Sequence, residues 1–233
     1  GIAVATTTQT VDSNERADYS KIKGDQIYAY ASWDQTPDFK GFYAVGALGY
    51  GRLHFNTDRQ MALVDGTVHS FHKAKAYTAA ISTGYDYSNE HFIARPYASL
   101  KYAKLDENAY TEDSNRGVNL SFDRVESDSL EGSLGFSFGG KFSIKAITFM
   151  PEVHVEYARE LDGSVDSVYA EFETGHGFTT PVRELSDKTL TYGCSLSAKI
   201  TENSMFNIAY DFIDYDSYND EATKVSTTFQ LRF

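Results

Sequence analysis

Apolar and polar residues alternate with a period of two along most of this chain. Successive side chains of a β-strand point to opposite faces of the sheet, so this pattern predicts half-buried strands. In one run, Leu190, Tyr192, Cys194, Leu196, Ala198 and Ile200 alternate with glycine or polar residues. No convincing segment repeats apolar residues at i, i+3, i+4 and i+7, as an amphipathic helix would. The sequence therefore predicts an all-β fold.

The last strand of the sequence ends on an aromatic residue. One predicted face carries Val225, Phe229, Leu231 and Phe233, and the other carries Ser226, Thr228, Gln230 and Arg232. An unpaired strand edge is costly in lipid, so the last strand of an outer-membrane barrel must close the cylinder. This ending favours a transmembrane β-barrel over a soluble β-sandwich.

Ten strands are predicted, and the segments between them alternate in length. The strands are 1–11, 26–33, 41–56, 73–87, 92–105, 118–139, 143–160, 188–201, 204–215 and 222–233. Tight turns are expected at 35–38, 88–90, 139–141 and 201–203, and long polar loops at 12–25, 57–70, 106–117 and 161–187. This alternation is typical of an antiparallel up-and-down barrel with its long loops outside the cell. Residues 164–174 are interpreted as an excursion of the last of these loops, because an eleventh spanning strand would invert the order.

Length, hydropathy and charge agree with such a barrel. A chain of 233 residues suffices for one large β domain, expected to span residues 1–233. No run of about 18 apolar residues offers a membrane helix, but a barrel exposes only alternate residues to lipid. The net charge of −12 argues against a nucleic-acid partner. The single cysteine, Cys194, excludes an internal disulfide and is interpreted as a small lipid-facing hydrophobe.

Two strands assign the lipid and lumen faces most clearly. In the first, Pro96, Ala98, Leu100 and Tyr102 alternate with Arg95, Tyr97, Ser99 and Lys101; in the second, Phe149, Pro151, Val153, Val155 and Tyr157 alternate with Met150, Glu152, His154 and Glu156. A Lys or Arg facing lipid costs about 2–4 kcal/mol at the bilayer midplane, so the charged sets are expected to face the lumen. The expected lumen-facing polar residues are Arg95, Lys101, Glu131, Glu152, Glu156, Lys199, Asp211 and Arg232. They either line a channel or pair with one another to brace the wall.

Several short pieces of the sequence occur in the order of a known family. They include Tyr50-Gly51-Arg52, the run Arg-Pro-Tyr-Ala-Ser-Leu-Lys-Tyr at 95–102, the run Ser-Leu-Glu-Gly-Ser-Leu-Gly at 129–135, and Leu231-Arg232-Phe233. Together they resemble the C-terminal translocator domain of autotransporters, the monomeric type V secretion family of Gram-negative bacteria. The resemblance covers essentially the whole chain, and the 95–102 and 129–135 runs carry most of its weight.

The resemblance implies a barrel of twelve strands preceded by a helix that threads the pore. In that register Gly1 begins the third strand, so we expect about ten of the twelve strands here, in an N-terminally truncated domain. The absence of an initiator methionine agrees with that expectation. Ten strands alone would either close with a smaller bore or leave two edges.

The implied function is an outer-membrane translocator that anchors a linked N-terminal passenger domain and helps to export it. The implied partners are this passenger, the barrel-assembly machinery, and outer-membrane lipid with lipopolysaccharide. On this reading Phe229, Leu231 and Phe233 carry the assembly signal. The alternative is a complete ten-stranded porin or adhesin barrel, or an outer-membrane barrel protease or lipase.

The sequence offers little for an enzyme, so no catalytic residue, metal site or cofactor is expected. His69 and His72 lie three residues apart, which on a strand places the imidazoles on opposite faces and makes a poor metal pair. His154, between Glu152 and Glu156, is the best acid–base candidate. An inward-facing polar strand gives the same pattern without catalysis. Self-cleavage of a passenger by Glu131, Glu152 or Glu156 is the minor alternative.

Overall fold

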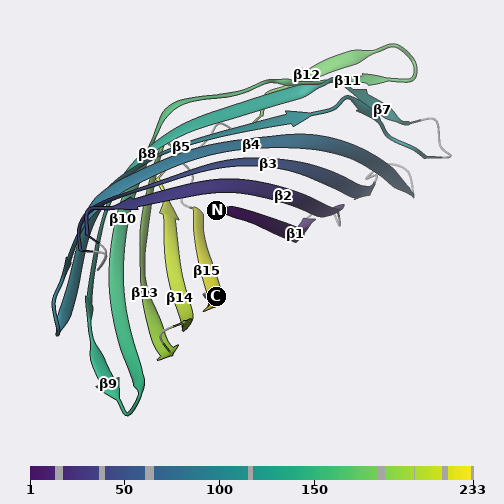
Figure 1. The fold of residues 1–233 in the computed structure, drawn as a ribbon. Coiled ribbons are helices and arrows are strands. Elements are labelled where there is room, and N and C mark those ends of the chain that lie inside the picture. The colour runs from purple at the N-terminus through teal and green to yellow at the C-terminus, as the bar shows by residue number, and fades with distance from the viewer. Residues whose placement is uncertain are drawn as a thin grey trace.

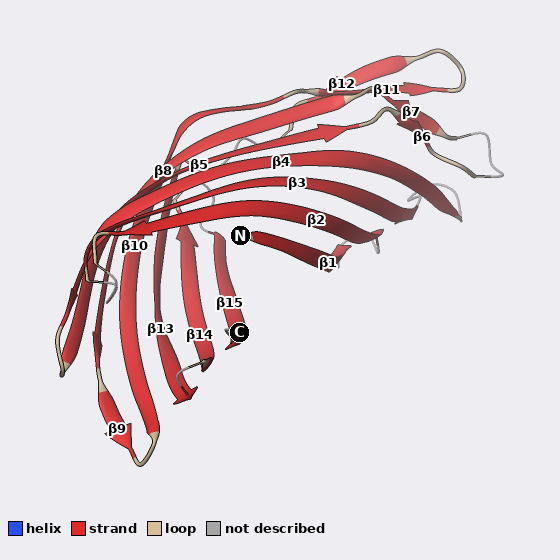
Figure 2. Cartoon of the chain, in the orientation of Figure 1, coloured by secondary structure: helices blue, strands red, loops and turns tan. Residues whose placement is uncertain are grey.

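The chain folds into β-strands, as Figure 2 shows. The computed structural model describes residues 1–13, 18–36, 40–60, 66–114, 118–182, 187–201, 203–216 and 220–231. Within these ranges there is no helix, which confirms the all-β prediction. Accordingly, no described helix is long and apolar enough to span a membrane.

Ten long antiparallel strands make the main sheet. They are β1 (Ile2–Ser13), β2 (Asp18–Asp34), β3 (Gly41–Gln60), β4 (Thr67–Ser88), β5 (Phe92–Glu107), β8 (Val125–Gly140), β10 (Ile147–Val165), β13 (Lys188–Thr201), β14 (Ser204–Tyr215) and β15 (Asp220–Leu231). Each long strand pairs with the next long strand along the chain, and the short β9 (Phe142–Ile144) pairs with β10. The predicted up-and-down order is confirmed.

The sheet curls, as Figure 1 shows, with β1 and β15 as its two ends. Within the described residues no ladder joins β1 to β15, so the sheet is an open, strongly curled wall. Backbone N–H and C=O groups on both edge strands therefore lack a ladder partner on one side.

Several predicted loops are wrong because the strands are longer than the apolar alternation. The β1–β2 ladder runs from Ile2 opposite Ala29 to Ser13 opposite Asp18, through most of the expected loop at 12–25. The β3–β4 ladder likewise continues to Gln60 opposite Thr67. Beyond the lipid the outer face of these strand ends no longer meets acyl chains, so backbone pairing continues there without an outer apolar stripe.

A small second sheet forms from the two longest connections. Its order is β12 (Gly177–Thr180), β11 (Val168–Phe172), β7 (Leu120–Phe122) and β6 (Tyr110–Thr111). The interpretation of 164–174 as a loop excursion is confirmed for 168–172, because β11 pairs with β7 and β12 and not with the main sheet, whereas Ser164 and Val165 are the end of β10 and pair with β8. The predicted strand 118–139 is wrong at its start, since 120–122 belong to the small sheet, where Leu120 is buried.

The expected tight turn at 139–141 is also displaced. β8 continues to Gly140, and the β9–β10 hairpin turns at Lys145 and Ala146. Lys145 has a φ of 55°, in the left-handed region that tight turns require. The glycine pair that suggested the turn is instead part of the ladder, where Gly139 lies opposite Glu152.

Candidate functional site: the inner face of the curled sheet

The two faces of the main sheet differ in chemistry and in burial. Directly opposed residues of a ladder share a face, so Ser137, Arg95 and His154 lie together, as do Val153 and Phe138. Side chains converge on the concave face of a curled sheet and diverge on its convex face. Ser137 is only 5% exposed whereas Val153 is 57% exposed. The polar set therefore occupies the inner face, and the apolar set the outer face.

Arg95 is the centre of the first polar cluster on the inner face. Its Nε donates to Oδ2 of Asp86 at 2.5 Å, and its Nη1 donates to Oε2 of Glu152 at 3.1 Å. Asp86 is on β4 and Glu152 on β10, so the guanidinium ties β4, β5 and β10 together across β8. The small Ser137 on β8 leaves room for this reach. Arg95 and Glu152 are thus brought together as the sequence suggested, and Asp86 was missed.

A second polar cluster lines a hollow of about 370 Å³. It contains four of the residues expected to face the lumen: Lys101, Glu131, Glu156 and Asp211. Lys101 Nζ lies 3.5 Å from Glu131 Oε1, and His154 Nε2 lies 3.2 Å from Asp211 Oδ1. These contacts agree with the prediction that inner charges pair and brace the wall.

Two predicted lumen residues remain apart from these clusters. Lys199 lies opposite Thr148 and Met205, and no ion pair from it occurs within the described ranges. Arg232 lies outside the described residues, as does Phe233 of the expected assembly signal. Phe229, opposite Phe206, and Leu231 are exposed on β15.

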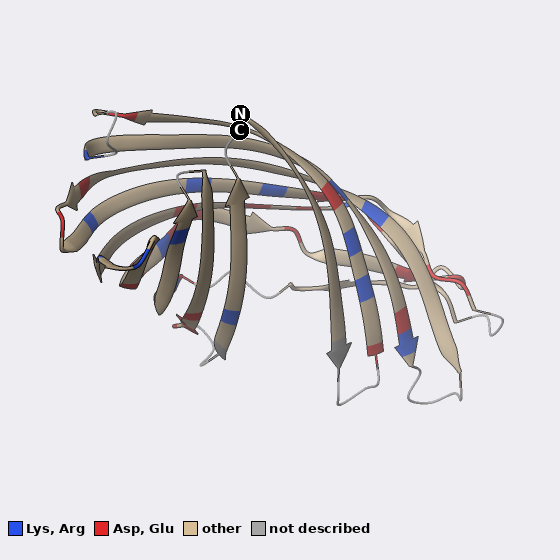
Figure 3. Ribbon diagram, turned by 60° about the horizontal axis from the view of Figure 1, so that its bottom comes forward, with Lys and Arg blue, Asp and Glu red and all other residues tan. Residues whose placement is uncertain are grey.

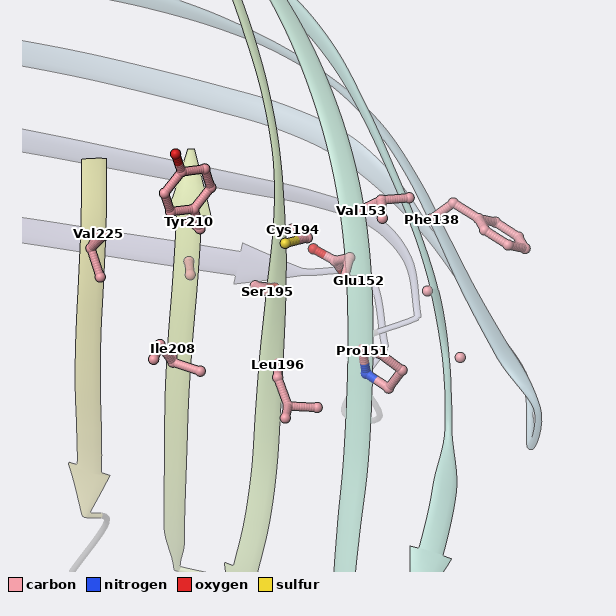
Figure 4. Close-up of a pocket in the computed structure, with 13 residues that line it drawn as sticks. Phe138, Pro151, Glu152, Val153, Cys194, Ser195, Leu196, Ile208, Tyr210 and Val225 are labelled. Carbon is pink, nitrogen blue, oxygen red and sulfur yellow. The ribbon is translucent and has the colours of Figure 1, made fainter. Parts of the chain in front are cut away.

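The outer face carries an apolar band across the strands. One row crosses five strands through directly opposed pairs: Phe138, Val153, Cys194, Tyr210 and Val225. Figure 4 shows these side chains around a shallow hollow of about 690 Å³. Cys194 is an exposed free thiol in this row, consistent with its interpretation as a small outward-facing hydrophobe.

Aromatic residues mark the two borders of the outer face. On β4, three tyrosines are exposed: Tyr77 near one border, and Tyr85 and Tyr87 near the other. Tyr85 is eight residues from Tyr77 along the strand, and Tyr87 is ten. At about 3.4 Å per residue and a tilt of about 40°, ten residues rise about 26 Å, close to the height of an outer-membrane apolar band. Tyr50 stands beside Tyr77 at 5.4 Å between ring centroids, and Phe42 beside Tyr85 at 5.0 Å.

The small sheet rests on the inner face at the loop end of the wall. Four rings form a column, Phe55, His72, Tyr110 and Phe122, with successive centroids 4.6, 4.0 and 4.7 Å apart. Nε2 of the buried His72 lies 2.9 Å from Glu107 Oε1. His69, three residues away, is exposed and contacts Asp58 at 2.6 Å. The two imidazoles therefore lie on opposite faces, as predicted.

An ion pair also fixes the small sheet to the wall. Arg59 donates from Nε and Nη2 to both carboxylate oxygens of Glu112, at 3.0 and 2.6 Å. Glu112 is 7% exposed and also accepts a hydrogen bond from the backbone N–H of Leu120. This pair raises the pKa of Arg59 through its hydrogen bond to Glu112. This pair could not be predicted from the sequence, because the partners are 53 residues apart.

The sequence's metal and acid–base candidates lie among the described residues. No group of three or more His, Cys, Asp or Glu side chains there could hold a metal ion. His154, the acid–base candidate, contacts Asp211 rather than a nucleophilic hydroxyl or thiol. The missed Asp86 did carry a sequence signal, since a single charge between Tyr85 and Tyr87 alternates with the outer-face aromatics.

Comparisons with known proteins agree with this geometry. The family model of the autotransporter beta-domain matches residues 1–211. The translocator domain of the autotransporter NalP from Neisseria meningitidis aligns with a TM-score of 0.76 at 16% identity, covering 100% of this chain and 74% of that chain. The beta domain of the Bordetella autotransporter BrkA aligns with a TM-score of 0.66 at 13% identity, covering 99% of this chain and 89% of that chain. A search of curated proteins gave no match.

Proposed function

This chain belongs to the family of autotransporter beta-domains, and we propose that it works without enzymatic chemistry, as a two-faced wall. The family makes it a translocator in the bacterial outer membrane for a linked passenger domain. Its outer face meets lipid, and its inner face offers a polar surface to an exported segment.

The observation that carries this proposal is the difference between the two faces: charged residues line the inner face, and an apolar band crosses the outer face. On the inner face, Arg95 is held by Asp86 and Glu152, and Lys101 by Glu131. Because the charges are paired, the inner face stays polar while its net electrostatic potential is reduced. Such a surface offers hydrogen-bond partners to a passing polypeptide but no strong unpaired charge that would bind it tightly.

The expected assembly partner is the barrel-assembly machinery, acting on β15. Three outer-face residues of that strand, Val225, Phe229 and Leu231, are well exposed. Because β15 is an edge of the sheet, its apolar stripe and its free backbone groups are both available to an assembly factor. Lipopolysaccharide is the expected lipid partner on the loop side.

Translocation is tested in intact Gram-negative cells with the full-length precursor. The passenger should become sensitive to added protease at the cell surface, while the barrel stays in the outer-membrane fraction and migrates heat-modifiably. Replacing Phe229 and Leu231 with Ala should lower the inserted amount, with Thr227→Ala on the same face as the control. A folded barrel that leaves its passenger in the periplasm would overturn the translocator mechanism.

The non-enzymatic part is tested separately. Replacing Glu131, Glu152 and Glu156 together with Gln removes the acidic candidates while keeping their size. The passenger should show the same gel mobility and the same surface yield as in the wild type. Loss of a cleavage product in this variant would show that the inner carboxylates act on the passenger, and the non-enzymatic proposal would be wrong.

A further inference from the structure

A group of cations stands on the outer face of β2, β3 and β4, although the whole chain has a net charge of −12. The ladder places Lys23 opposite His54 and His54 opposite Lys73; next to this row, Arg52 lies opposite Lys75. Lys21 follows on β2. Figure 3 shows the blue Lys and Arg segments side by side on these neighbouring strands. We call Lys21, Lys23, Arg52, Lys73 and Lys75 the basic patch.

The basic patch lies just beyond the aromatic border of the apolar band. Tyr50 and Tyr77 are directly opposite each other in that border, and Arg52 and Lys75 are two residues further toward the loops. With about 3.4 Å per residue and a tilt of about 40°, Lys75 stands about 5 Å and Lys73 about 10 Å above Tyr77. Lys75 therefore lies within the polar headgroup layer, which is about 5–8 Å thick on each side of the bilayer, and Lys73 lies just above that layer. This end carries the longest connections, which makes it the extracellular end of the barrel.

The basic patch carries five cations, and the protein sets three carboxylates beside it. Asp106 lies opposite Lys75 but is held by Arg124 at 2.6 and 2.7 Å. Asp58 contacts His69 at 2.6 Å, and Asp25, opposite Arg52, accepts a hydrogen bond from Thr6 and keeps its charge. Across the described part of the chain, no ion pair involves any of the five cations. Arg52 bonds only the phenol of Tyr50, at 3.3 Å, and Lys73 stands 5.9 Å from the ring of Phe71.

A groove of about 510 Å³ joins the basic patch to the apolar band. Val4, Ile27 and Tyr50 form its apolar side, and Arg52 and His54 stand at the end nearer the loops, with one carboxylate, Asp25, opposite Arg52. An occupant with an apolar chain and an anionic head would match both halves. Neither a free anion nor a soluble peptide would use the lipid-facing half.

We propose that the basic patch and this groove bind the phosphorylated saccharide headgroup of lipopolysaccharide, with an acyl chain along Val4 and Ile27. The proposal rests on the membrane orientation of the proposed function. The cations are about 5–10 Å apart along and across strands, so one headgroup with several phosphates can reach more than one of them. The bound lipid would hold the β1–β4 side of the wall at a fixed depth in the outer leaflet.

The test uses the full chain purified in a zwitterionic detergent. Native mass spectrometry or gel filtration counts bound molecules of intact lipopolysaccharide, of lipopolysaccharide stripped of phosphate, and of inorganic phosphate as competitor. The variant K21Q/K23Q/K73Q/K75Q removes four cations that form no ion pair within the described residues. The control K104Q/K188Q removes two cations at the same end that already pair with Glu126 and Asp216.

The wild type and the control should bind intact lipopolysaccharide equally, and the quadruple variant at least about tenfold more weakly, since each cation near an anionic surface contributes to binding. Removing the phosphates from the lipid should weaken binding to the same degree. Equal binding by the quadruple variant, or by the stripped lipid, would overturn the proposal. Competition by inorganic phosphate at equal concentration would identify a simple anion site and overturn the lipid assignment.

Surface display separates this proposal from the proposed function. The quadruple variant should keep its heat-modifiable migration and should still display a passenger on cells. If the wild type fails to display its passenger, the translocator mechanism fails, whatever the lipid binding shows. If display succeeds and lipid binding is unaffected by the substitutions, only the lipid site is wrong.

Discussion

The guanidinium of Arg95 on β5 lies 3.1 Å from the carboxylate of Glu152 on β10, although β8 separates the two strands. Such a contact needs a concave face, because side chains two strands apart diverge on a convex one. The same guanidinium also donates to Asp86 on β4, the neighbouring strand on the other side of β5. The pair therefore helps to set the curl of the wall as well as the polarity of the inner face.

Removing Arg95 should destabilise the barrel more than removing Lys101 does. Arg95→Ala leaves Asp86, which is 8% exposed, and Glu152 without their cation. Breaking a buried pair from one side costs about 3–5 kcal/mol, and the partial exposure of Arg95 lowers our expectation to about 1–3 kcal/mol. Lys101, whose side chain is 62% exposed, should cost under about 1 kcal/mol. Urea unfolding in lipid vesicles, followed by heat-modifiable migration, measures both. Equal losses would show that Arg95 does not brace the curl.

The sequence could predict the strands and their faces because lipid imposes a period of two on every spanning segment. Val153 and Cys194, taken as outward-facing from alternation alone, do lie in one row. Strand ends such as Ser13 and Gln60 could not be predicted, since outside lipid they are held by backbone pairing and polar contacts, which need no apolar alternation. Arg59–Glu112 was also out of reach, because no local pattern joins residues that meet only through tertiary folding. The basic patch was hidden in the same way, since its cations are scattered over three strands.

Gly139 should be intolerant of a methyl group, and Gly46 should accept one. A Cβ on Gly139 would stand 2.5 Å from the carbonyl oxygen of Pro151, a backbone atom of the neighbouring strand that cannot rotate away. A Cβ on Gly46 meets nothing nearer than 3.9 Å. Gly139→Ala should therefore cost about 1–3 kcal/mol through overpacking, whereas Gly46→Ala should change stability by under about 1 kcal/mol. The same unfolding assay compares them, and a neutral Gly139→Ala would contradict the close approach of β8 and β10.

The ion pair between Glu112 and Arg59 should fix the small sheet to the wall, whereas the pair between Arg124 and Asp106 should contribute little. Both pairs are bidentate, but the Arg59–Glu112 pair is the more buried: its side chains are 36% and 6% exposed, against 56% and 13% for Arg124 and Asp106. Glu112→Ala leaves Arg59 and the N–H of Leu120 unpaired, so limited proteolysis should cut the segment 108–124 much faster. Arg124→Ala should change that rate by less than about fivefold, since exposed pairs are weak. If the two variants are cut equally fast, burial of the Glu112 pair does not hold the sheet.

Tyr110 should make the attachment of the small sheet sensitive to alkaline pH. Burial raises the pKa of its phenol to about 12, and Glu107 and Glu112 add to the rise while Arg59 opposes it. A raised phenol pKa favours the neutral, folded form, so its stabilisation is complete below pH 10 and is lost as the pH rises through about 12. The absorbance difference at 295 nm between the wild type and Tyr110→Phe should titrate near pH 12, and the variant should keep its ring contact with His72. A midpoint near 10, the ordinary value for tyrosine, would mean that the phenol is in water. In that case β6 would not pack against His72 in the membrane-inserted protein.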